Sequence, residues 1–225
     1  MKYKAILFDL DDTLLDSMPA RVKAFERVLA LAGVTHLKAE QFLRDIQGVA
    51  LAAALPELAA DLNLKMDLFE EFRRYYWSKE KGLLELYPGV REMLRELRER
   101  EMRLGLVTSK EMDFKVEGRD AGAATELAEL GISHLFSVKV GLEDVKLRKP
   151  HPEAIHLALS RLALAPHEAV MVGDSASDIK AAQAAGCHAC YATWGIPAEE
   201  RDNLLNHVYP DFIIDSPEDL LRIVK

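Results

Sequence analysis

The stretch that decides the fold is YKAILFDLDDTLL, residues 3–15. Its first six residues form a short, mostly apolar run that stops at aspartates, as a buried parallel strand does when its C-terminal end opens into a site. Asp9 and Asp11 point to the same side if the strand continues, and a turn there brings both into one crevice. The stretch therefore predicts a strand that leads into an acidic site.

Further strand and helix patterns alternate along the chain. Strand-like runs occur at residues 103–108 (RLGLVT), 169–173 (AVMVG) and 188–193 (HACYAT), with weaker candidates at 136–140 and 212–215. Helix-period segments lie at 90–100, 125–130, 152–162 and 175–185, and Gly131 and Gly186 follow two of them as C-terminal caps. Alternating strands and helices indicate an α/β fold with a Rossmann-like parallel-sheet core, whose ligand crevice lies at the carboxyl ends of the strands.

One region breaks this alternation, because residues 19–82 show only helical periodicity. We expect roughly four helices there, at 24–33, 39–48, 51–62 and 68–80. The chain leaves the sheet after the first strand and returns at Tyr87-Pro88-Gly89, a turn signal that also starts the next helix. The prediction is a catalytic core made of residues 1–16 and 86–225, with an all-helical domain, residues 17–85, inserted into it.

Composition excludes several classes of protein. The 225 residues are 49% hydrophobic, enough for a sizeable core, and 29 Lys and Arg stand against 37 Asp and Glu, giving a net charge of -8. There is no basic run that could follow a nucleic-acid polymer. The N-terminal segment meets aspartates too early for a signal peptide, and no later stretch approaches ~18 apolar residues. We therefore expect a cytoplasmic protein without nucleic-acid or membrane partners; the oligomeric state is not predicted.

The two cysteines, Cys187 and Cys190, form a C-x-x-C pair, a spacing found in metal sites and redox couples. They fall in a predicted strand, where residues three apart point to opposite faces and cannot share an ion. We therefore interpret them as two small buried residues.

A second acidic cluster, Gly173-Asp174-Ser175-Ala176-Ser177-Asp178, also follows a buried strand. Alone it is a weak signal, because Asp174 could simply cap the next helix. Together with Asp9 and Asp11 it is stronger, since crowded carboxylates cost stability unless a cation lies among them. Hard oxygen ligands without His or thiolate favour Mg²⁺.

A phosphate ligand also needs hydroxyl donors and positive charge. Thr108-Ser109-Lys110 ends the second buried strand, although an ordinary helix cap there is the alternative. Lys149 precedes a proline at a helix start, where its ammonium group could face an anion. Lys146 and Arg148 compete for that role, and any one of these side chains alone is more often a solvated surface charge.

These motifs, in this order and over nearly the whole chain, resemble those of the haloacid dehalogenase (HAD) superfamily. The helical insert looks like that family's C1-type cap, and two short segments resemble its phosphoglycolate phosphatase-like branch. The residues that carry the resemblance are Asp9, Asp11, Thr13, Thr108, Lys149-Pro150, Gly173, Asp174 and Asp178, with Tyr87-Pro88-Gly89-Val90 and Thr193-Trp194-Gly195 for the branch.

The resemblance implies a Mg²⁺-dependent phosphatase that hydrolyses a small phosphorylated metabolite: a phosphoglycolate-like ester, a sugar phosphate or a nucleotide. It assigns Asp9 as the nucleophile that forms an aspartyl-phosphate and Asp11 as general acid and base. Thr13 would fix the turn. The phosphate would be held by Thr108, Ser109 and Lys149, and the metal by Asp9, the Asp11 carbonyl, Asp174 and Asp178.

Other activities remain open at this stage. The acid at Asp11 argues against a dehalogenase or phosphonate-cleaving member, whose leaving groups need no such proton. A phosphomutase or pyrophosphatase of the same superfamily uses the same residues. A receiver domain of signalling proteins also surrounds a phosphorylated aspartate with Mg²⁺, Thr and Lys, but it lacks a cap and the G-D-x-x-x-D cluster, so it is a weaker alternative.

Two features depart from the family pattern. Residues 111–122 (EMDFKVEGRDAG) intervene where a helix usually begins, and we interpret them as a surface loop, with a substrate-contacting lid as the alternative. Lys149 lies in LRKP rather than G-K-P, so its assignment depends on the proline that follows. Trp194 is a candidate substrate contact. Four arginines of the insert are expected on solvated helix faces, with contact to a substrate anion as the alternative: Arg21, Arg44, Arg73 and Arg74.

Overall fold

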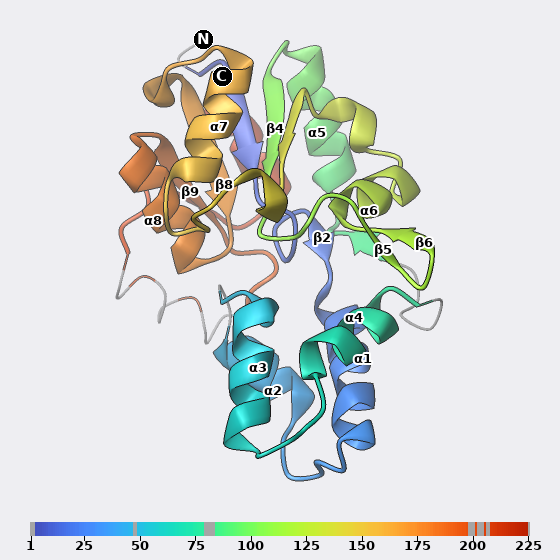
Figure 1. The fold of residues 1–225 in the computed structure, drawn as a ribbon. Helices are drawn as coiled ribbons and strands as arrows, with labels where there is room; N and C mark the ends of the chain where they lie inside the picture. Colours follow the sequence, from blue (N-terminus) through green and yellow to red (C-terminus); the bar gives the residue numbers. More distant parts are fainter. Residues whose placement is uncertain are drawn as a thin grey trace.

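A central sheet of six parallel strands runs in the order β10-β9-β8-β1-β4-β7 in this computed structural model, which describes residues 3–46, 49–78, 84–197, 201, 205 and 208–224 (Figure 1). Every strand predicted from the sequence is present, with ends within two residues of those expected. The strands are β1 (Ala5–Phe8), β4 (Arg103–Val107), β7 (Val138–Val140), β8 (Ala169–Gly173), β9 (His188–Ala192) and β10 (Phe212–Ile214).

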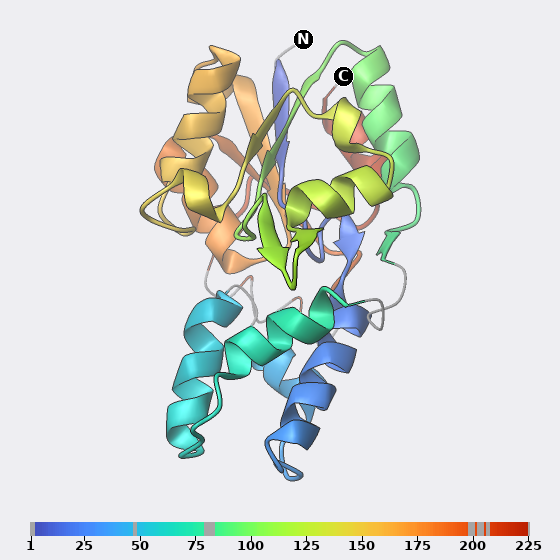
Figure 2. The ribbon, with the colours of Figure 1, turned by 45° about the vertical axis from the view of Figure 1, so that its right-hand side comes forward.

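Helices cover both faces of the sheet, as Figure 2 shows for α5 and α7 on its opposite sides. Helices α5 (Val90–Glu99), α6 (Ala123–Glu129) and α10 (Pro217–Ile223) pack on one face, and α7 (Glu153–Leu162) and α8 (Ala176–Ala185) on the other. Along β1 the fully buried side chains alternate: Ile6 and Phe8 enter the first core, Ala5 and Leu7 the second. Burial on both faces explains why this strand is an apolar run.

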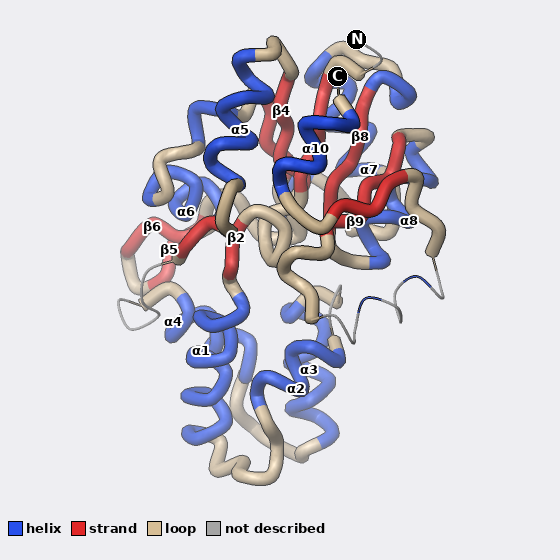
Figure 3. The backbone as a smooth tube through the Cα atoms, turned by 180° about the vertical axis from the view of Figure 1, so that it is seen from behind, coloured by secondary structure: helices blue, strands red, loops and turns tan. Residues whose placement is uncertain are grey.

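The helical insert has a hydrophobic core of its own, below the sheet in Figures 1 and 3. The four expected helices are α1 (Met18–Leu31), α2 (Ala39–Asp45), α3 (Leu51–Asp61) and α4 (Leu68–Tyr76). A two-stranded antiparallel ribbon, β2 (Leu15–Asp16) with β3 (Glu85–Leu86), joins the two connections to the core. Two-residue strands carry too little pattern to be expected from sequence. The observed architecture is an α/β core plus a helical cap, and the division at residues 17 and 85 stays a prediction.

Residues 111–122 lie mostly at the surface, as predicted, but the prediction that they form a loop is wrong. They contain an antiparallel hairpin, β5 (Phe114–Val116) and β6 (Arg119–Ala121), with Gly118 in the left-handed conformation in its turn. Figures 1 and 2 place this hairpin at the lower edge of the core, directly above α4. Strands of three residues give no reliable period-2 signal, and the pairing and the contact with α4 are tertiary.

The two cysteines are free and buried on opposite sides of the sheet, which agrees with the interpretation that they share no ion. Cys187 lies in the core on the α7 and α8 side of the sheet, and Cys190 lies in the core on the side covered by α5, α6 and α10. Across the described part of the chain, no helix is long and apolar enough to cross a membrane.

Burial raises the pKa of the Cys187 thiol to about 12. Since only the thiolate is nucleophilic, little of it exists at pH 8, and the side chain is also shielded from reagents. We expect iodoacetamide to alkylate Cys187 at least ~100-fold more slowly in the folded protein than in denaturant at pH 8. Mass spectrometry of timed samples measures both rates, and rapid native labelling would show that this thiol is exposed.

Candidate active site

The loop after β1 turns sharply at the carboxyl edge of the sheet. The Asp9 N–H donates to the Val172 carbonyl oxygen (3.0 Å), so the nucleophile candidate is held beside β8. Asp12 adopts a left-handed conformation with φ 59°, and the N–H groups of Leu14 and Leu15 both donate to the Leu10 carbonyl oxygen at 2.9 Å. The loop therefore has one defined path, and Asp11 lies beside Asp9.

Thr13 joins this loop to the fourth motif. Its side chain is fully buried, and its hydroxyl donates to Asp174 Oδ1 at 2.9 Å. The Trp194 indole N–H donates to the Thr13 carbonyl oxygen at 2.8 Å. This contact explains Trp194 as a support of the loop, and the structural role expected for Thr13 agrees with both bonds.

The fourth motif is built from the end of β8 and the start of α8. Ser175 caps α8, and its hydroxyl and N–H both donate to Asp178 Oδ2, at 2.5 and 3.1 Å. The cap is therefore Ser175 rather than Asp174, whose carboxylate is left to face Asp9. A Cβ on Gly173 would lie 2.4 Å from the Asp178 Cβ, so only glycine allows this close approach.

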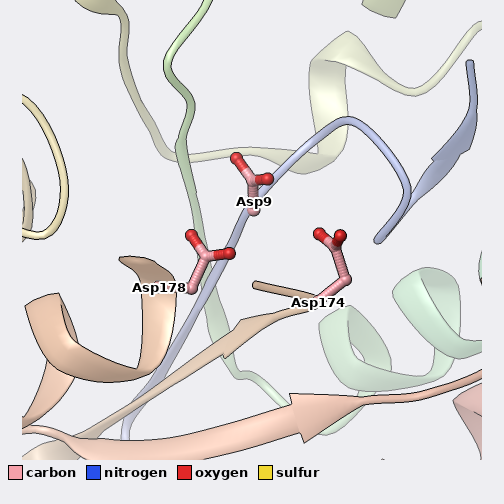
Figure 4. Close-up of side chains that lie close together, drawn as sticks. All are labelled: Asp9, Asp174 and Asp178. Carbon is pink, nitrogen blue, oxygen red and sulfur yellow. The ribbon is translucent and has the colours of Figure 1, made fainter. Parts of the chain in front are cut away.

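Three carboxylates converge at this edge of the sheet (Figure 4). Asp9, Asp174 and Asp178 each offer an oxygen, and these oxygens all lie within 4.8 Å of one another. Asp174 and Asp178 are 3% and 0% exposed, so water screens their charges poorly. Burial above all, with repulsion from Asp178 and Asp11, raises the pKa of Asp9 to about 7 against the opposing effect of Lys149. A cation at this position would hold Asp9 ionised at neutral pH.

Lys149 is the positive charge nearest to these carboxylates. Its Nζ lies 2.8 Å from Asp9 Oδ1, 2.6 Å from Asp178 Oδ1 and 3.1 Å from the Val107 carbonyl oxygen. Although burial opposes the charged form, the two carboxylates hold the pKa of Lys149 above its usual range. Of its competitors, Lys146 is exposed and Arg148 is exposed beside the cavity described below. The structure therefore places Lys149, not its neighbours, against the acidic cluster.

Thr108 and Ser109 follow β4 and line the same cavity. Thr108 is 5% exposed, and its Oγ1 accepts the Lys110 N–H at 3.1 Å, which leaves the hydroxyl hydrogen free to donate to a ligand. Ser109 is exposed and offers a second hydroxyl. Register explains their position, because Phe8 pairs with Leu106 on one side and Val172 on the other, so all three strands end at one edge.

Sequence reasoning missed the group that surrounds Asp11. The Lys110 Nζ lies 2.8 Å from Asp11 Oδ1 and 2.8 Å from Glu126 Oε2, and the Glu126 side chain is fully buried. Tyr76 of α4 donates its hydroxyl to Glu126 Oε1 at 2.9 Å and accepts from Lys110 at 3.0 Å. Burial raises the pKa of Asp11, but Lys110 and Arg21 outweigh it, so the net shift is downward. One ion-pair network thus connects the acid/base candidate with the cap.

The cap arginines are not all on solvated faces. Arg21 is half-buried, with 16% of its side chain exposed, and forms an ion pair with Asp12. Arg73 is 20% exposed at its side chain and faces the cavity. Arg44 pairs with Glu40 on the cap surface, and Arg74 is 55% exposed. The expectation of solvated faces fails for Arg21 and Arg73. The Arg21 guanidinium pairs with Asp12 of the core, and that of Arg73 pairs with Glu111.

These groups surround a cavity of about 190 Å³ between the core and the cap, large enough for a small molecule. At its core end lie the carboxylates of Asp9, Asp11, Asp12 and Asp174 with Lys149. At its other end lie side chains of α4 and of the β5–β6 hairpin. The arrangement combines a cation-binding set of oxygens, a fixed ammonium group and hydroxyl donors, which is what an anionic phosphoryl group requires.

This chain is similar to known proteins over most of its length. A family model described as haloacid dehalogenase-like hydrolase matches residues 6–192. Pyrophosphatase PpaX of Bacillus pumilus is 36% identical over 219 residues, covering 97% of this chain and 95% of that protein. Phosphoglycolate phosphatase of Yersinia pestis is 34% identical over 232 residues, covering 100% of this chain and 95% of that protein.

Two solved structures are similar to this chain over nearly its whole length. The crystal structure of a predicted phosphoglycolate phosphatase from Haemophilus somnus has a TM-score of 0.79 and 28% identity, and the match covers 100% of this chain and 99% of that one. A putative β-phosphoglucomutase from Thermotoga maritima has a TM-score of 0.72 and 30% identity, with 98% of each chain covered. The chain belongs to the haloacid dehalogenase-like hydrolase family. The relatives named above are a pyrophosphatase and a phosphoglycolate phosphatase.

Proposed function

We propose that this protein is a Mg²⁺-dependent phosphatase that hydrolyses a small-molecule phosphate monoester through an aspartyl-phosphate on Asp9. The observation that carries the proposal is the convergence of Asp9, Asp174 and Asp178 within 4.8 Å, beside the Lys149 ammonium group. Lys149 balances only one of these three negative charges, and two of the acids, Asp174 and Asp178, are buried, so the repulsion that remains is costly unless a further cation binds.

The donor set fits Mg²⁺. Oxygens held about 2.1 Å from one ion lie at most about 4.2 Å apart, so small side-chain rotations would bring these carboxylates into reach. Asp9, Asp174, the Asp11 carbonyl and, through water, Asp178 would hold the ion. When bound, it would supply positive charge between the nucleophile and the phosphoryl oxygens, whose repulsion otherwise opposes attack.

Each remaining residue has a step that its position supports. Asp9 Oδ attacks phosphorus, the ester P–O bond breaks, and Asp11 donates a proton to the departing oxygen. Asp11 then accepts a proton from the water that attacks the aspartyl-phosphate, which releases inorganic phosphate and restores Asp9. Thr108 donates a hydrogen bond to a phosphoryl oxygen, Ser109 offers a second hydroxyl, and Lys149 neutralises the charge that forms.

A cytoplasmic location and a small phosphorylated metabolite as partner stay predictions of this proposal. Inorganic phosphate release is the readout that separates a phosphatase from a mutase, which returns the phosphoryl group to its substrate. Acetyl phosphate and simple alkyl phosphates serve as test substrates, with Mg²⁺ present or removed by EDTA. The proposal expects phosphate release that EDTA abolishes and Mg²⁺ restores, and metal-independent hydrolysis would contradict it.

Asp174→Asn tests the ion site. Asparagine keeps an oxygen that can accept the Thr13 hydroxyl, so the loop contact survives while one negative ligand is lost. We expect the Mg²⁺ concentration for half-maximal activity to rise at least ~10-fold. Asp61→Asn, at the exposed end of α3, is the matched control and leaves the Mg²⁺ requirement unchanged. An unchanged requirement in Asp174→Asn would remove this carboxylate from the site.

A further inference from the structure

The end of the cavity opposite the carboxylates is formed jointly by α4 of the cap and the β5–β6 hairpin of the core. The guanidinium of Arg73 lies over the Phe114 ring, 4.1 Å from its centroid, and the Trp77 ring meets Phe114 edge to face at 5.5 Å and 89°. Arg73 also forms an ion pair with Glu111 at 3.2 Å. Both views of the ribbon show the hairpin against this helix (Figures 1 and 2).

This end of the cavity is mostly apolar. The leaving group of a substrate whose phosphorus faces Asp9 extends toward it, because the core end is filled by the phosphoryl-binding residues. The side chains that it would meet are carbon-rich and come from the cap and the hairpin: Val49, Leu51, Phe69, Phe72, Trp77 and Phe114. Burying an apolar group against them is favourable, whereas burying a polar group without a partner is costly.

Within the described part of the chain, the cations that line the cavity form ion pairs with carboxylates, with the exception of Arg148. Arg21 pairs with Asp12, and Lys110 pairs with Asp11 and Glu126. Arg73 faces two carboxylates, Glu70 and Glu111, each at 3.2 Å, so the charge of this trio is negative. Two cavity cations remain. Lys149 pairs with Asp9 and Asp178 at the core end, and Arg148 is exposed. A carboxylate or second phosphate on the leaving group would therefore meet negative charge at the cap end.

We propose that the wall formed by Phe114 of the hairpin, Arg73 of α4 and Trp77 at the C-terminal end of that helix is the specificity determinant. It selects phosphate monoesters with an uncharged, apolar leaving group over anionic ones. This inference rests on the proposed phosphatase function. It narrows the substrate class, because phosphoglycolate and pyrophosphate, which name the activities of the relatives, both carry a second anionic group.

A matched pair of substrates tests the selection. Benzyl phosphate and 4-carboxybenzyl phosphate share a primary-alcohol leaving group and differ by one negative charge. We expect kcat/KM for benzyl phosphate to be at least ~10-fold higher, mainly through KM, since the charge loses its hydration and gains no partner. Phosphoglycolate should likewise be a poorer substrate than its uncharged isostere, isobutyl phosphate.

Two substitutions connect that preference to the wall. Phe114→Ala should raise KM for benzyl phosphate about 10-fold, and Phe114→Leu should recover most of the loss, because the apolar contact returns. Glu111→Gln leaves Arg73 with one carboxylate partner fewer, so the benzyl to 4-carboxybenzyl ratio of kcat/KM should fall about 5-fold. Lys115→Ala, at a 69% exposed hairpin position, is the control and should leave every ratio unchanged. Circular dichroism confirms that each variant folds.

The outcomes separate this inference from the proposed function. If acetyl phosphate releases phosphate with Mg²⁺ but 4-carboxybenzyl phosphate is hydrolysed as well as benzyl phosphate, the apolar selection is wrong and the phosphatase proposal stands. Unchanged KM values in folded Phe114→Ala would remove the hairpin from the site in the same way. If the wild-type protein releases no phosphate even from acetyl phosphate, the proposed function and the inference both fail.

Discussion

Asp9→Asn will lower Mg²⁺-dependent phosphate release from alkyl phosphates by at least ~10⁴-fold. The amide has nearly the shape of the carboxylate, but its nitrogen and neutral oxygen cannot attack phosphorus, and one charged ligand of the cation is lost. Remaining hydrolysis would come only from water attack in a site that still binds the phosphoryl group. Steady-state assays with acetyl phosphate and benzyl phosphate measure the loss.

The fold should survive this change. Lys149 keeps its 2.6 Å contact with Asp178, and the Asp9 N–H bond to Val172 involves only backbone. The asparagine side chain is neutral, and burial at this position disfavours a charged group. We therefore expect the midpoint of thermal unfolding to lie within a few degrees of that of the wild type. Strong phosphate release by the folded Asp9→Asn protein would refute Asp9 as nucleophile.

The effect of Asp11→Asn on the rate of Asp9 phosphorylation should depend on the leaving group of the substrate. An alkoxide leaves poorly without a proton, so we expect alkyl phosphates to be hydrolysed about 10³-fold more slowly. Acetate needs no proton to leave, so acetyl phosphate should still phosphorylate Asp9. The second step then lacks its base, and a phosphorylated enzyme should accumulate. Rapid mixing should show a burst of acetate release followed by a slow phase.

The same pre-steady-state behaviour with both substrates, either a burst of leaving-group release from each or from neither, would argue that Asp11 has no acid/base role. The Asp11→Asn protein also loses the ion pair with Lys110, whose other partner, Glu126, remains. Lys110→Met is therefore a useful comparison, because it removes the same ion pair and leaves the Asp11 carboxyl in place. The effect of Lys110→Met on the rate of phosphorylation should not depend on the leaving group of the substrate.

Much of the site could be predicted because its residues follow strongly patterned elements. Asp9, Thr108 and Asp174 each come directly after a buried parallel strand, and the carboxyl ends of such strands meet at one edge. Their order along the chain was enough to indicate a shared crevice. In the sequence, only the proline that follows distinguishes Lys149 from Lys146 and Arg148. The fold shows that the side chain of Lys149 is the one that reaches Asp9.

The missed features depend on contacts between segments far apart in sequence. Glu126 lies in TELAEL, where helical periodicity gives no reason to bury a glutamate, and its burial depends on Lys110 and Tyr76. The β5–β6 hairpin is stabilised by its contact with α4, which no local pattern encodes. The sequence predicts that Arg21 and Arg73 are exposed, because the periodicity of a helix does not show which of its turns contacts the core.

The relatives' names do not by themselves fix the substrate of this chain. They describe activities on phosphoglycolate and on pyrophosphate, and one similar structure is described as a putative phosphoglucomutase. These activities share the attack on phosphorus and differ in the group that leaves. The core end of the cavity accounts for the shared step, and the wall at α4 and the hairpin is where this chain would differ.

Borohydride trapping tests the central claim most directly, that the carboxylates at the ends of β1 and β8 converge so that Asp9 attacks phosphorus. Borohydride reduces an acyl phosphate to an alcohol, which converts a phosphorylated aspartate to homoserine. In the Asp11→Asn protein, quenched with borohydride during turnover of acetyl phosphate and Mg²⁺, peptide mass spectrometry should find homoserine in place of Asp9, and none without substrate. Homoserine at another aspartate, with Asp9 unmodified, would contradict the account.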